Sequence, residues 1–287
     1  MSEKVGLDWV GMIKAGRPLD QAGLKVIDAH AHLGPYSDFY IPRPNAATMV
    51  TTMDRLGVAQ ACICSIPACG ADVPRGNDMT AAAVRAYPDR FVGYASVNPH
   101  YPERVLPELE RSFDQLGLSM IKLHPSIVEY PISGPAYEPV WRFASERHTV
   151  VLSHTWSGES NCSPKQFEPL AKAYPDVIFI LGHSGGTPAG YAEAIDAALE
   201  YPNIYLDICR SAMSRVWVER IVTKAGPDRV LWGTDFPFLD PVYLIGRLAC
   251  TTLSDEAKRK VFGESMEKLL QTLGRSPFVV DKKEPGR

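Results

Sequence analysis

The chain has 287 residues, 45% of them hydrophobic, and its 30 basic and 33 acidic residues give a formal net charge of −3. That length and composition suffice for one large α/β barrel or two smaller domains with a full core, and they argue against a disordered chain. The lack of a long basic run argues against nucleic acid or an anionic membrane as the main partner.

Targeting and redox signals favour a soluble, cytoplasmic protein. The opening segment MSEKVGLDWVGMIKAGRPLD has no continuous apolar stretch typical of a secretory signal, and no run approaches the length of a membrane span. None of the six cysteines forms a C-x-x-C pair, which argues against a thiolate zinc site. Cys62, Cys64 and Cys209 lie in apolar runs and are expected to be buried, reduced thiols.

Short β-rich runs recur at even intervals along the chain, and segments of helical character separate them. The runs are KVIDAHAHL from Lys25, QACICSI from Gln60, RFVGYASV from Arg90, SMIKLH from Ser119, TVVLSHT from Thr149, VIFILGH from Val177, NIYLDIC from Asn203 and RVLWGTD from Arg229. Such alternation predicts βαβ units and a parallel sheet.

The intervening segments carry helix start and stop signals. Residues 46–57 end at Gly57, a favourable C-cap, and residues 77–87 begin at Asn77 and Asp78, both favourable N-caps. We predict a single-domain α/β fold, a (β/α)8 barrel over residues 25–275, with an open doubly wound sheet as the alternative. Residues 1–24 would form an N-terminal extension (a helix or lid), and residues 276–287 a charged C-terminal tail.

Histidines gather where strands are expected to end. Six of the seven, all except His148, lie at or just after the end of a strand-like run, the end where functional side chains of a barrel meet. His30 and His32 form an H-x-H pair on the first run, where alternation places Asp28 on the same inward face. Buried polar side chains need partners. A metal ion would satisfy both imidazoles, and two hydrogen-bonded histidines are the alternative.

The same alternation turns polar residues inward at the ends of other runs. His183 is expected to share the inward face of the sixth run with Phe179 and Leu181. The others are Lys122 and His124 on the fourth run, His154 on the fifth and Asp235 on the eighth.

These side chains suit a divalent metal. Imidazole and carboxylate ligands favour zinc, with manganese as the alternative, over calcium or magnesium. The ion would activate a bound water and polarise a substrate carbonyl. Asp235 would both bind the ion and accept the water proton, and His183 would stabilise developing charge or donate a proton.

The segment GHSGG at 182–186 also fits G-x-S-x-G, the nucleophile elbow of serine hydrolases. That arrangement needs a histidine after the serine, and no histidine follows His183 in the chain. We therefore interpret Ser184 as a bystander. Gly185 and Gly186 are expected to turn the backbone sharply and to direct their N–H groups toward a substrate anion.

Five motifs, in order, resemble the amidohydrolase superfamily: VIDAHAH, IKLHP, LSHT, LGHSGG and LWGTDFP. The resemblance covers about residues 25–275 and is strongest to the amidohydrolase-related branch that includes aminocarboxymuconate-semialdehyde decarboxylase and pyrone-dicarboxylate lactonase. It implies a barrel in which His183 is a catalytic residue beside the metal. The ligands that it implies are His30, His32, His154 and Asp235.

Lys122 leaves the number of ions open. Other superfamily members bridge two metals through a carboxylated lysine on the fourth strand, and His154 and His183 would then hold the second ion. The K-L-H-P form resembles the single-metal branch, so we favour one ion and assign Lys122 to a substrate carboxylate or carbonyl. In the last helix, Ser265 and Met266 stand where family members often carry an Asn-Ala segment.

Residues that follow the strands suggest a small carboxylated substrate, aromatic or cyclic. Arg210 offers a bidentate fork for a carboxylate. The predicted substrate-binding residues are Lys122, His124, Trp156 and Arg210, with apolar walls from Phe236 and Phe238 and an entrance near Tyr36, Asn98 and His100.

Three classes of function remain open. The first, which the absence of large insertions favours, is a hydrolase of a lactone, amide or ester. The second is a non-oxidative decarboxylase of an aromatic or unsaturated carboxylic acid, in which Asp235 or His183 would protonate carbon. The third is a non-catalytic binding protein, which the complete ligand set argues against. We expect a small-molecule substrate, and the resemblance suggests a homodimer or larger homo-oligomer.

Overall fold

The computed structural model describes residues 6–36 and 40–273. Within them, eight parallel strands pair in chain order from β1 to β8. The strands are β1 (Val26–Leu33), β2 (Val58–Ser65), β3 (Phe91–Ala95), β4 (Met120–Leu123), β5 (Val150–His154), β6 (Ile178–Gly182), β7 (Ile204–Asp207) and β8 (Val230–Leu231). The segment after β8 returns to β1, where the Asp235 N–H donates to the His30 carbonyl at 2.7 Å. The predicted (β/α)8 barrel is therefore confirmed.

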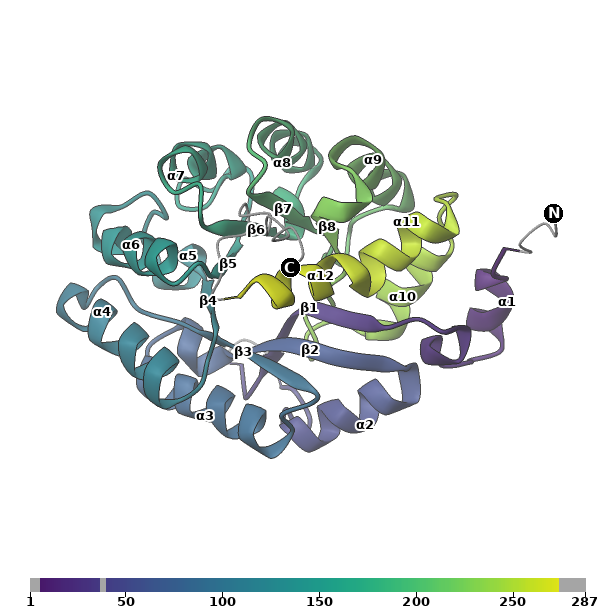
Figure 1. The fold of residues 1–287 in the computed structure, drawn as a ribbon, viewed down its shortest axis with the longest axis horizontal. Helices are drawn as coiled ribbons and strands as arrows, with labels where there is room; N and C mark the ends of the chain where they lie inside the picture. The colour runs from purple at the N-terminus through teal and green to yellow at the C-terminus, as the bar shows by residue number, and fades with distance from the viewer. Residues whose placement is uncertain (1–5, 37–39, 274–287) are drawn as a thin grey trace, which may run out of the picture.

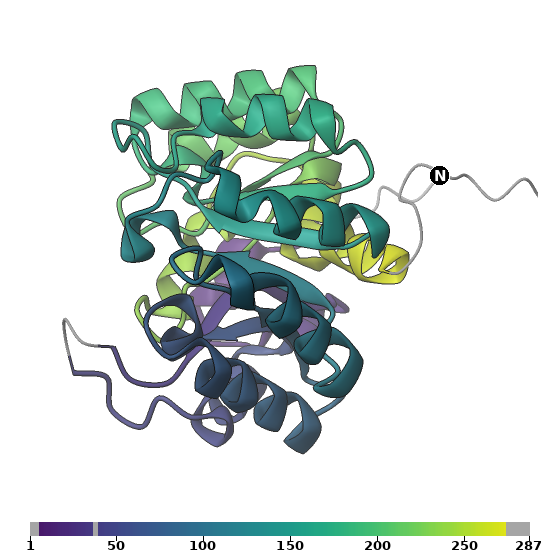
Figure 2. The ribbon, with the colours of Figure 1, turned by 90° about the vertical axis from the view of Figure 1, so that its left-hand side faces the viewer.

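Helices surround the strands, as Figure 1 shows. They are α2 (Ala46–Leu56), α3 (Val73–Ala86), α4 (Pro102–Glu110), α5 (Pro125–Val128), α6 (Glu138–Glu146), α7 (Phe167–Ala173), α8 (Pro188–Glu200), α9 (Arg215–Ala225) and α10 (Pro241–Ala249), followed by α11 (Asp255–Arg259) and α12 (Ser265–Thr272). In the side view of Figure 2, α12 lies at one end of the barrel. A side chain at Gly263 would collide with the Lys25 carbonyl just before β1. The chain before α12 therefore covers the end where strands begin, and a site can form only at the other end.

Apolar burial divides into two layers. Alternate strand residues fill the barrel interior, and the others pack outward against the helices. The interior cluster includes Ile27, Ala29, Cys62, Tyr94, Met120, Leu152, Ile180 and Leu231. The outer cluster includes Val26, Ala31, Ile63, Ile121, Val151, Phe179, Leu181 and Leu206.

The alternation expected on β1 fails at its centre. Ile27 and Ala29 lie in the interior cluster, so Asp28 does not share the inward face with the histidines. Its carboxylate accepts instead from the Thr234 N–H at 3.0 Å. The pairing register shifts between Asp28 and Ala31. Because a one-residue shift exchanges the two faces of a strand, His30 and His32 turn inward without Asp28.

The prediction for β6 is also wrong. Phe179 packs outward, with its ring centroid 5.8 Å from that of Trp141 on α6 and 6.3 Å from that of Phe167 on α7. His183 lies beyond the strand, in the 3-10 turn η6 (His183–Gly185), with φ 62°. This left-handed turn, rather than strand alternation, directs its side chain into the cavity at the end of the barrel where the strands finish.

Two helix signals had different outcomes. Gly57 ends α2 with φ 74°, as predicted. The N-cap expected at Asn77 or Asp78 is wrong, because α3 begins at Val73. Asn77 is buried within this helix, and its amide exchanges two 2.9 Å hydrogen bonds with the backbone of Ser96, just after β3. Tertiary contacts therefore override a residue type that ordinarily favours caps.

The N-terminal extension contains α1 (Trp9–Lys14) and the 3-10 helix η1 (Leu19–Ala22). The Trp9 ring stacks on that of Phe262 at 5.7 Å, and the Trp9 indole N–H donates to Asp255. The tail predicted at 276–287 lies outside the described residues. All six cysteines are free, and Cys62, Cys64 and Cys209 are buried as expected. In the part of the chain that the structure covers, we find no helix with the length and apolarity needed to cross a bilayer.

Candidate metal centre

A cavity of about 390 Å³, hereafter the catalytic cavity, lies where the strands end. All the predicted metal-binding and catalytic residues line it, as do the predicted substrate-binding residues other than Lys122, whereas Phe236, Asn98 and His100 do not. The lining residues are His30, His32, Tyr36, Ile66, His124, Ile127, His154, Trp156, His183, Arg210, Ser211, Asp235, Phe238 and Leu239. Barrel enzymes place their chemistry at this end.

Three imidazoles are oriented through their Nδ1 atoms. His30 Nδ1 lies 2.6 Å from a carboxylate oxygen of Asp207, and His32 Nδ1 lies 3.1 Å from the Cys64 carbonyl. His183 Nδ1 lies 2.5 Å from the Cys209 carbonyl. Because these partners only accept, each Nδ1 carries a proton and donates it. The Nε2 atom of each ring is thereby left for other partners, as in histidines that bind metals.

Two of these Nε2 atoms converge on Asp235. His32 Nε2 lies 3.2 Å and His30 Nε2 lies 3.7 Å from the same oxygen of Asp235. The three side chains form a cluster whose ligand atoms all lie within 4.8 Å of one another. Lone pairs on neighbouring nitrogens and a carboxylate repel unless a proton or cation lies between them. This donor set of two imidazoles and one carboxylate fits a divalent metal ion.

The protonation states match such a site. Burial, together with the nearby Lys122 charge, lowers the pKa of His30 well below its usual value, so this imidazole is neutral near pH 7. Burial opposes ionisation of Asp235. The closeness of His32, His183 and His30 outweighs that effect and holds the Asp235 pKa well below its usual range. Neutral imidazole and ionised carboxylate are the forms that bind metals.

His154 lies in the same cavity but outside this three-residue cluster. Its ring stacks between those of His124 and Trp156, at centroid distances of 4.1 and 5.7 Å. Its Nδ1 is buried and has no hydrogen-bond partner among the described residues. Burial also lowers its pKa well below the usual value. His154 is therefore neutral, but its ligand atom groups with Glu159 and Cys162 rather than with the cluster, so its role as a further ligand stays a prediction.

Asp207, at the end of β7, was not among the predicted site residues. It is fully buried and accepts from both His30 and the backbone N–H of Cys209. Burial raises its pKa to about 7. It ends the run IYLD of β7 in the same way that His154 ends β5. The position of an acidic residue at the end of a barrel strand was thus the signal in the sequence.

Lys122 is fully buried on β4 and does not line the cavity. Its Nζ lies 2.7 Å from His30 Nε2, so the ammonium donates to the lone pair that a metal would use. The substrate contact predicted for Lys122 stays a prediction.

The two residues with proposed chemistry adopt uncommon backbone conformations. His183 has φ 62° and Asp235 has φ 58°, in the left-handed region that residues with a Cβ rarely occupy. Such conformations cost about 1–3 kcal/mol each and cluster at functional sites.

The turn after β6 excludes a serine nucleophile. Ser184 is fully buried, and its hydroxyl donates to the Asp207 carbonyl at 2.7 Å. The Gly185 N–H donates to Thr155 Oγ1, and the Gly186 N–H donates to the His183 carbonyl. These glycine N–H groups are therefore engaged within the protein, and the expectation that they face a substrate anion is wrong.

One wall of the cavity carries a positive charge on an aromatic plane. The Arg210 guanidinium lies 4.4 Å above the Trp156 ring, and its Nε donates to the Gly186 carbonyl at 2.9 Å. Any side chain at Gly186 would collide with the Trp156 indole. Phe238 also lines the cavity and lies 5.4 Å from the His32 ring, whereas Phe236 does not line it. Stacking fixes the guanidinium plane, and the side chain is only partly buried, so its remaining N–H groups can meet an anion.

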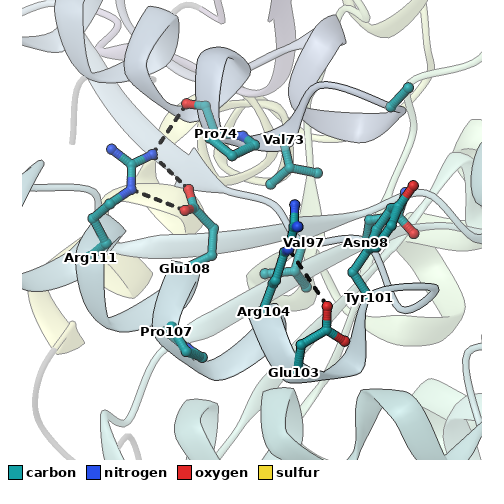
Figure 3. A pocket seen from close by; sticks show the side chains of 11 residues that line it. Val73, Pro74, Val97, Asn98, Tyr101, Glu103, Arg104, Pro107, Glu108 and Arg111 are labelled. Carbon is teal, nitrogen blue, oxygen red and sulfur yellow. Dashed lines mark hydrogen bonds and ion pairs between the residues drawn. The ribbon is translucent and has the colours of Figure 1, made fainter.

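A larger cavity, about 520 Å³, lies between α3 and α4 (Figure 3). Its charged groups are largely paired with each other, as in the Glu103–Arg104 and Glu108–Arg111 ion pairs. It contains none of the histidines. We therefore assign the chemistry to the smaller, histidine-lined cavity.

The chain belongs to the amidohydrolase family, whose pattern it matches over residues 27–271. It is 24% identical over 247 residues to gamma-resorcylate decarboxylase from Polaromonas sp. strain JS666, which covers 65% of this chain and 72% of that protein. Its fold is similar to that of 2,6-dihydroxybenzoate decarboxylase complexed with 2,6-dihydroxybenzoate. That similarity has a TM-score of 0.72 and 16% identity over 86% of this chain and 99% of that one. A 5-carboxyvanillate decarboxylase from Novosphingobium aromaticivorans, complexed with manganese and a nitrobenzoic acid, gives a TM-score of 0.69 and 16% identity over 88% of this chain and 98% of that one.

Proposed function

We propose that this member of the amidohydrolase family is a metal-dependent, non-oxidative decarboxylase of a hydroxylated aromatic carboxylic acid. The observation that carries the proposal is the presence, in one cavity, of the histidine–aspartate donor cluster and of Arg210 stacked on Trp156. Such a cavity suits a flat acid with a carboxylate at one end. The names of the similar proteins support decarboxylation better than the hydrolysis that the chain length favours.

The metal would be held by His30, His32 and Asp235, with His154 as the fourth ligand. When bound, the ion would supply positive charge that orients and polarises the oxygen atoms of the acid. Nitrogen and oxygen donors suit either zinc or manganese, and the similar 5-carboxyvanillate decarboxylase contains manganese. The K-L-H-P form of β4 favours one ion over two, and binding of that ion at His30 Nε2 would displace the Lys122 ammonium from this atom.

Side chains of the protein would bind the substrate and transfer the proton. Arg210 binds the substrate carboxylate, and Trp156 holds the guanidinium in place. His183 keeps its Nδ1–H on the Cys209 carbonyl; in the form that carries a second proton on Nε2, it delivers that proton to the ring carbon that bears the carboxylate. The carbon–carbon bond to the carboxylate then breaks, and its electron pair restores the aromatic ring as carbon dioxide leaves. Asp235 is ionised and would act as a ligand, so it could protonate carbon only after taking up a proton from a phenolic hydroxyl of the substrate.

Product analysis tests the proposal. The metal-reconstituted enzyme is incubated with hydroxybenzoates and, separately, with lactones, and released carbon dioxide and organic products are quantified. We expect carbon dioxide and a phenol from at least one hydroxybenzoate, and a loss of roughly 10²-fold or more in kcat in His183→Asn with normal metal content. Hydrolysis of a lactone without decarboxylation of any acid would contradict the proposal.

A further inference from the structure

The catalytic cavity does not end at the donor cluster. A second cavity of about 490 Å³, here named the outer lobe, adjoins it and shares three of its lining residues. The shared residues are Tyr36, Ile66 and Ile127. They come from the segments after β1, β2 and β4, so both cavities lie where the strands end. The two spaces therefore form one cleft with a common middle wall.

The outer lobe differs chemically from the catalytic cavity. Among the described residues that line it there is no Asp, Glu, Lys or Arg, and most are apolar, including Pro35, Pro67, Ala71 and Val128. Its polar groups are already engaged. His100 Nε2 lies 2.6 Å from the Val128 carbonyl, and Asn98 accepts from the His100 N–H and donates to the Gly70 carbonyl. The lobe thus offers apolar surface and few free hydrogen-bonding groups.

The middle wall exposes apolar surface to both cavities. Ile127, which lines the two of them, is 36% exposed. Covering such a side chain with an apolar group is favourable, at roughly 25 cal/mol per Å² of surface removed from water. A single-ring acid held at Arg210 and the donor cluster would leave the outer lobe empty.

We propose that the outer lobe is a substrate subsite for a neutral apolar substituent, aryl or alkyl, remote from the carboxylate. The preferred substrate is then a hydroxylated aromatic acid extended on the side of the ring opposite its carboxylate. This inference rests on the proposed function for the position of the carboxylate. The described residues of the lobe offer no charged partner for a second carboxylate or an amine, which favours a neutral extension.

Calorimetric titration of the metal-reconstituted protein tests the subsite with three probes. They are 2,6-dihydroxybenzoate, its 4-phenyl derivative, and 5-phenylresorcinol, which is the 4-phenyl acid without its carboxylate. We expect the 4-phenyl acid to bind roughly tenfold or more tightly than 2,6-dihydroxybenzoate. The variant Ala71→Trp fills the lobe from an exposed loop position outside the catalytic cavity. It should remove most of that gain and change the Kd of 2,6-dihydroxybenzoate less than twofold.

Leu199→Trp, at an exposed position of α8, is the matched control and should behave as wild type. Equal affinity of wild type for both acids, or equal effects of the two tryptophan variants, overturns the subsite. Carbon dioxide is measured in the same samples. A phenyl-dependent gain, with no carbon dioxide release from these acids or from any hydroxybenzoate of the panel, refutes the proposed function and keeps the subsite. Carbon dioxide release without the gain keeps the proposed function and overturns the subsite. If neither acid binds, 5-phenylresorcinol decides: binding that Ala71→Trp abolishes keeps the lobe, and no binding overturns it.

Discussion

Replacing Asp207 by asparagine tests how the donor cluster is held in place. The two carboxylate oxygens of Asp207 accept from different donors, His30 Nδ1 and the backbone N–H of Cys209. Asparagine has one oxygen and one NH₂ group, so one of the two donors loses its acceptor. Where the NH₂ group faces His30, the imidazole must move its proton to Nε2, the atom that a metal needs.

The substitution is expected to change both the stability of the protein and its affinity for the metal, and the two effects can be measured separately. Loss of one buried acceptor lowers the free energy of unfolding by about 1–3 kcal/mol. Loss of a carboxylate that orients a metal-binding histidine weakens metal binding roughly 10- to 100-fold. Competition with a chromophoric chelator measures the metal Kd, and circular dichroism verifies that the variant is folded. Asp196→Asn, an exposed change on α8, is the matched control. A folded Asp207→Asn protein with an unchanged metal Kd would refute the orienting role.

Two further substitutions test the cavity. Arg210→Lys keeps the charge but loses the planar stack on Trp156, so we expect KM for a hydroxybenzoate to rise roughly tenfold while kcat stays within twofold. Steady-state kinetics measure both, and a fall in kcat alone would contradict carboxylate binding by Arg210. Ser184→Ala removes a buried hydrogen bond to the Asp207 carbonyl and should lower the free energy of urea unfolding by about 1 kcal/mol without affecting kcat. Loss of activity with normal metal content would instead restore the serine-nucleophile interpretation.

The fold and the meeting of histidines at one end of the barrel could be predicted from the sequence. Alternating apolar runs and helical segments define the barrel, and its topology brings the ends of all strands together. Asp235 lies beside His30 and His32 for that reason, although it is about 200 residues away from them in the chain. Strand alternation also placed Lys122 correctly inside the barrel.

Backbone irregularities account for what could not be predicted. The register shift on β1 separates Asp28 from the histidines, and no residue pattern in VIDAHAH signals it. The left-handed conformation of His183 reverses the alternation expected on β6. Asp207 was overlooked because its role depends on a contact with His30, 177 residues away in the chain. Side-chain partners of this kind are set by tertiary structure, so local sequence does not reveal them.

Metal analysis tests the central claim most directly. Wild type, Asp235→Asn and Asp240→Asn are reconstituted with zinc or manganese and desalted, and the number of metal ions per chain is measured by inductively coupled plasma mass spectrometry. Asp240 caps α10 at an exposed position, and asparagine caps equally well, so Asp240→Asn is the matched control. We expect about one ion per chain in wild type and in the control, and less than roughly a tenth of that in Asp235→Asn. A wild-type protein that retains no divalent metal, or an Asp235→Asn protein that retains it in full, would contradict the proposed metal centre.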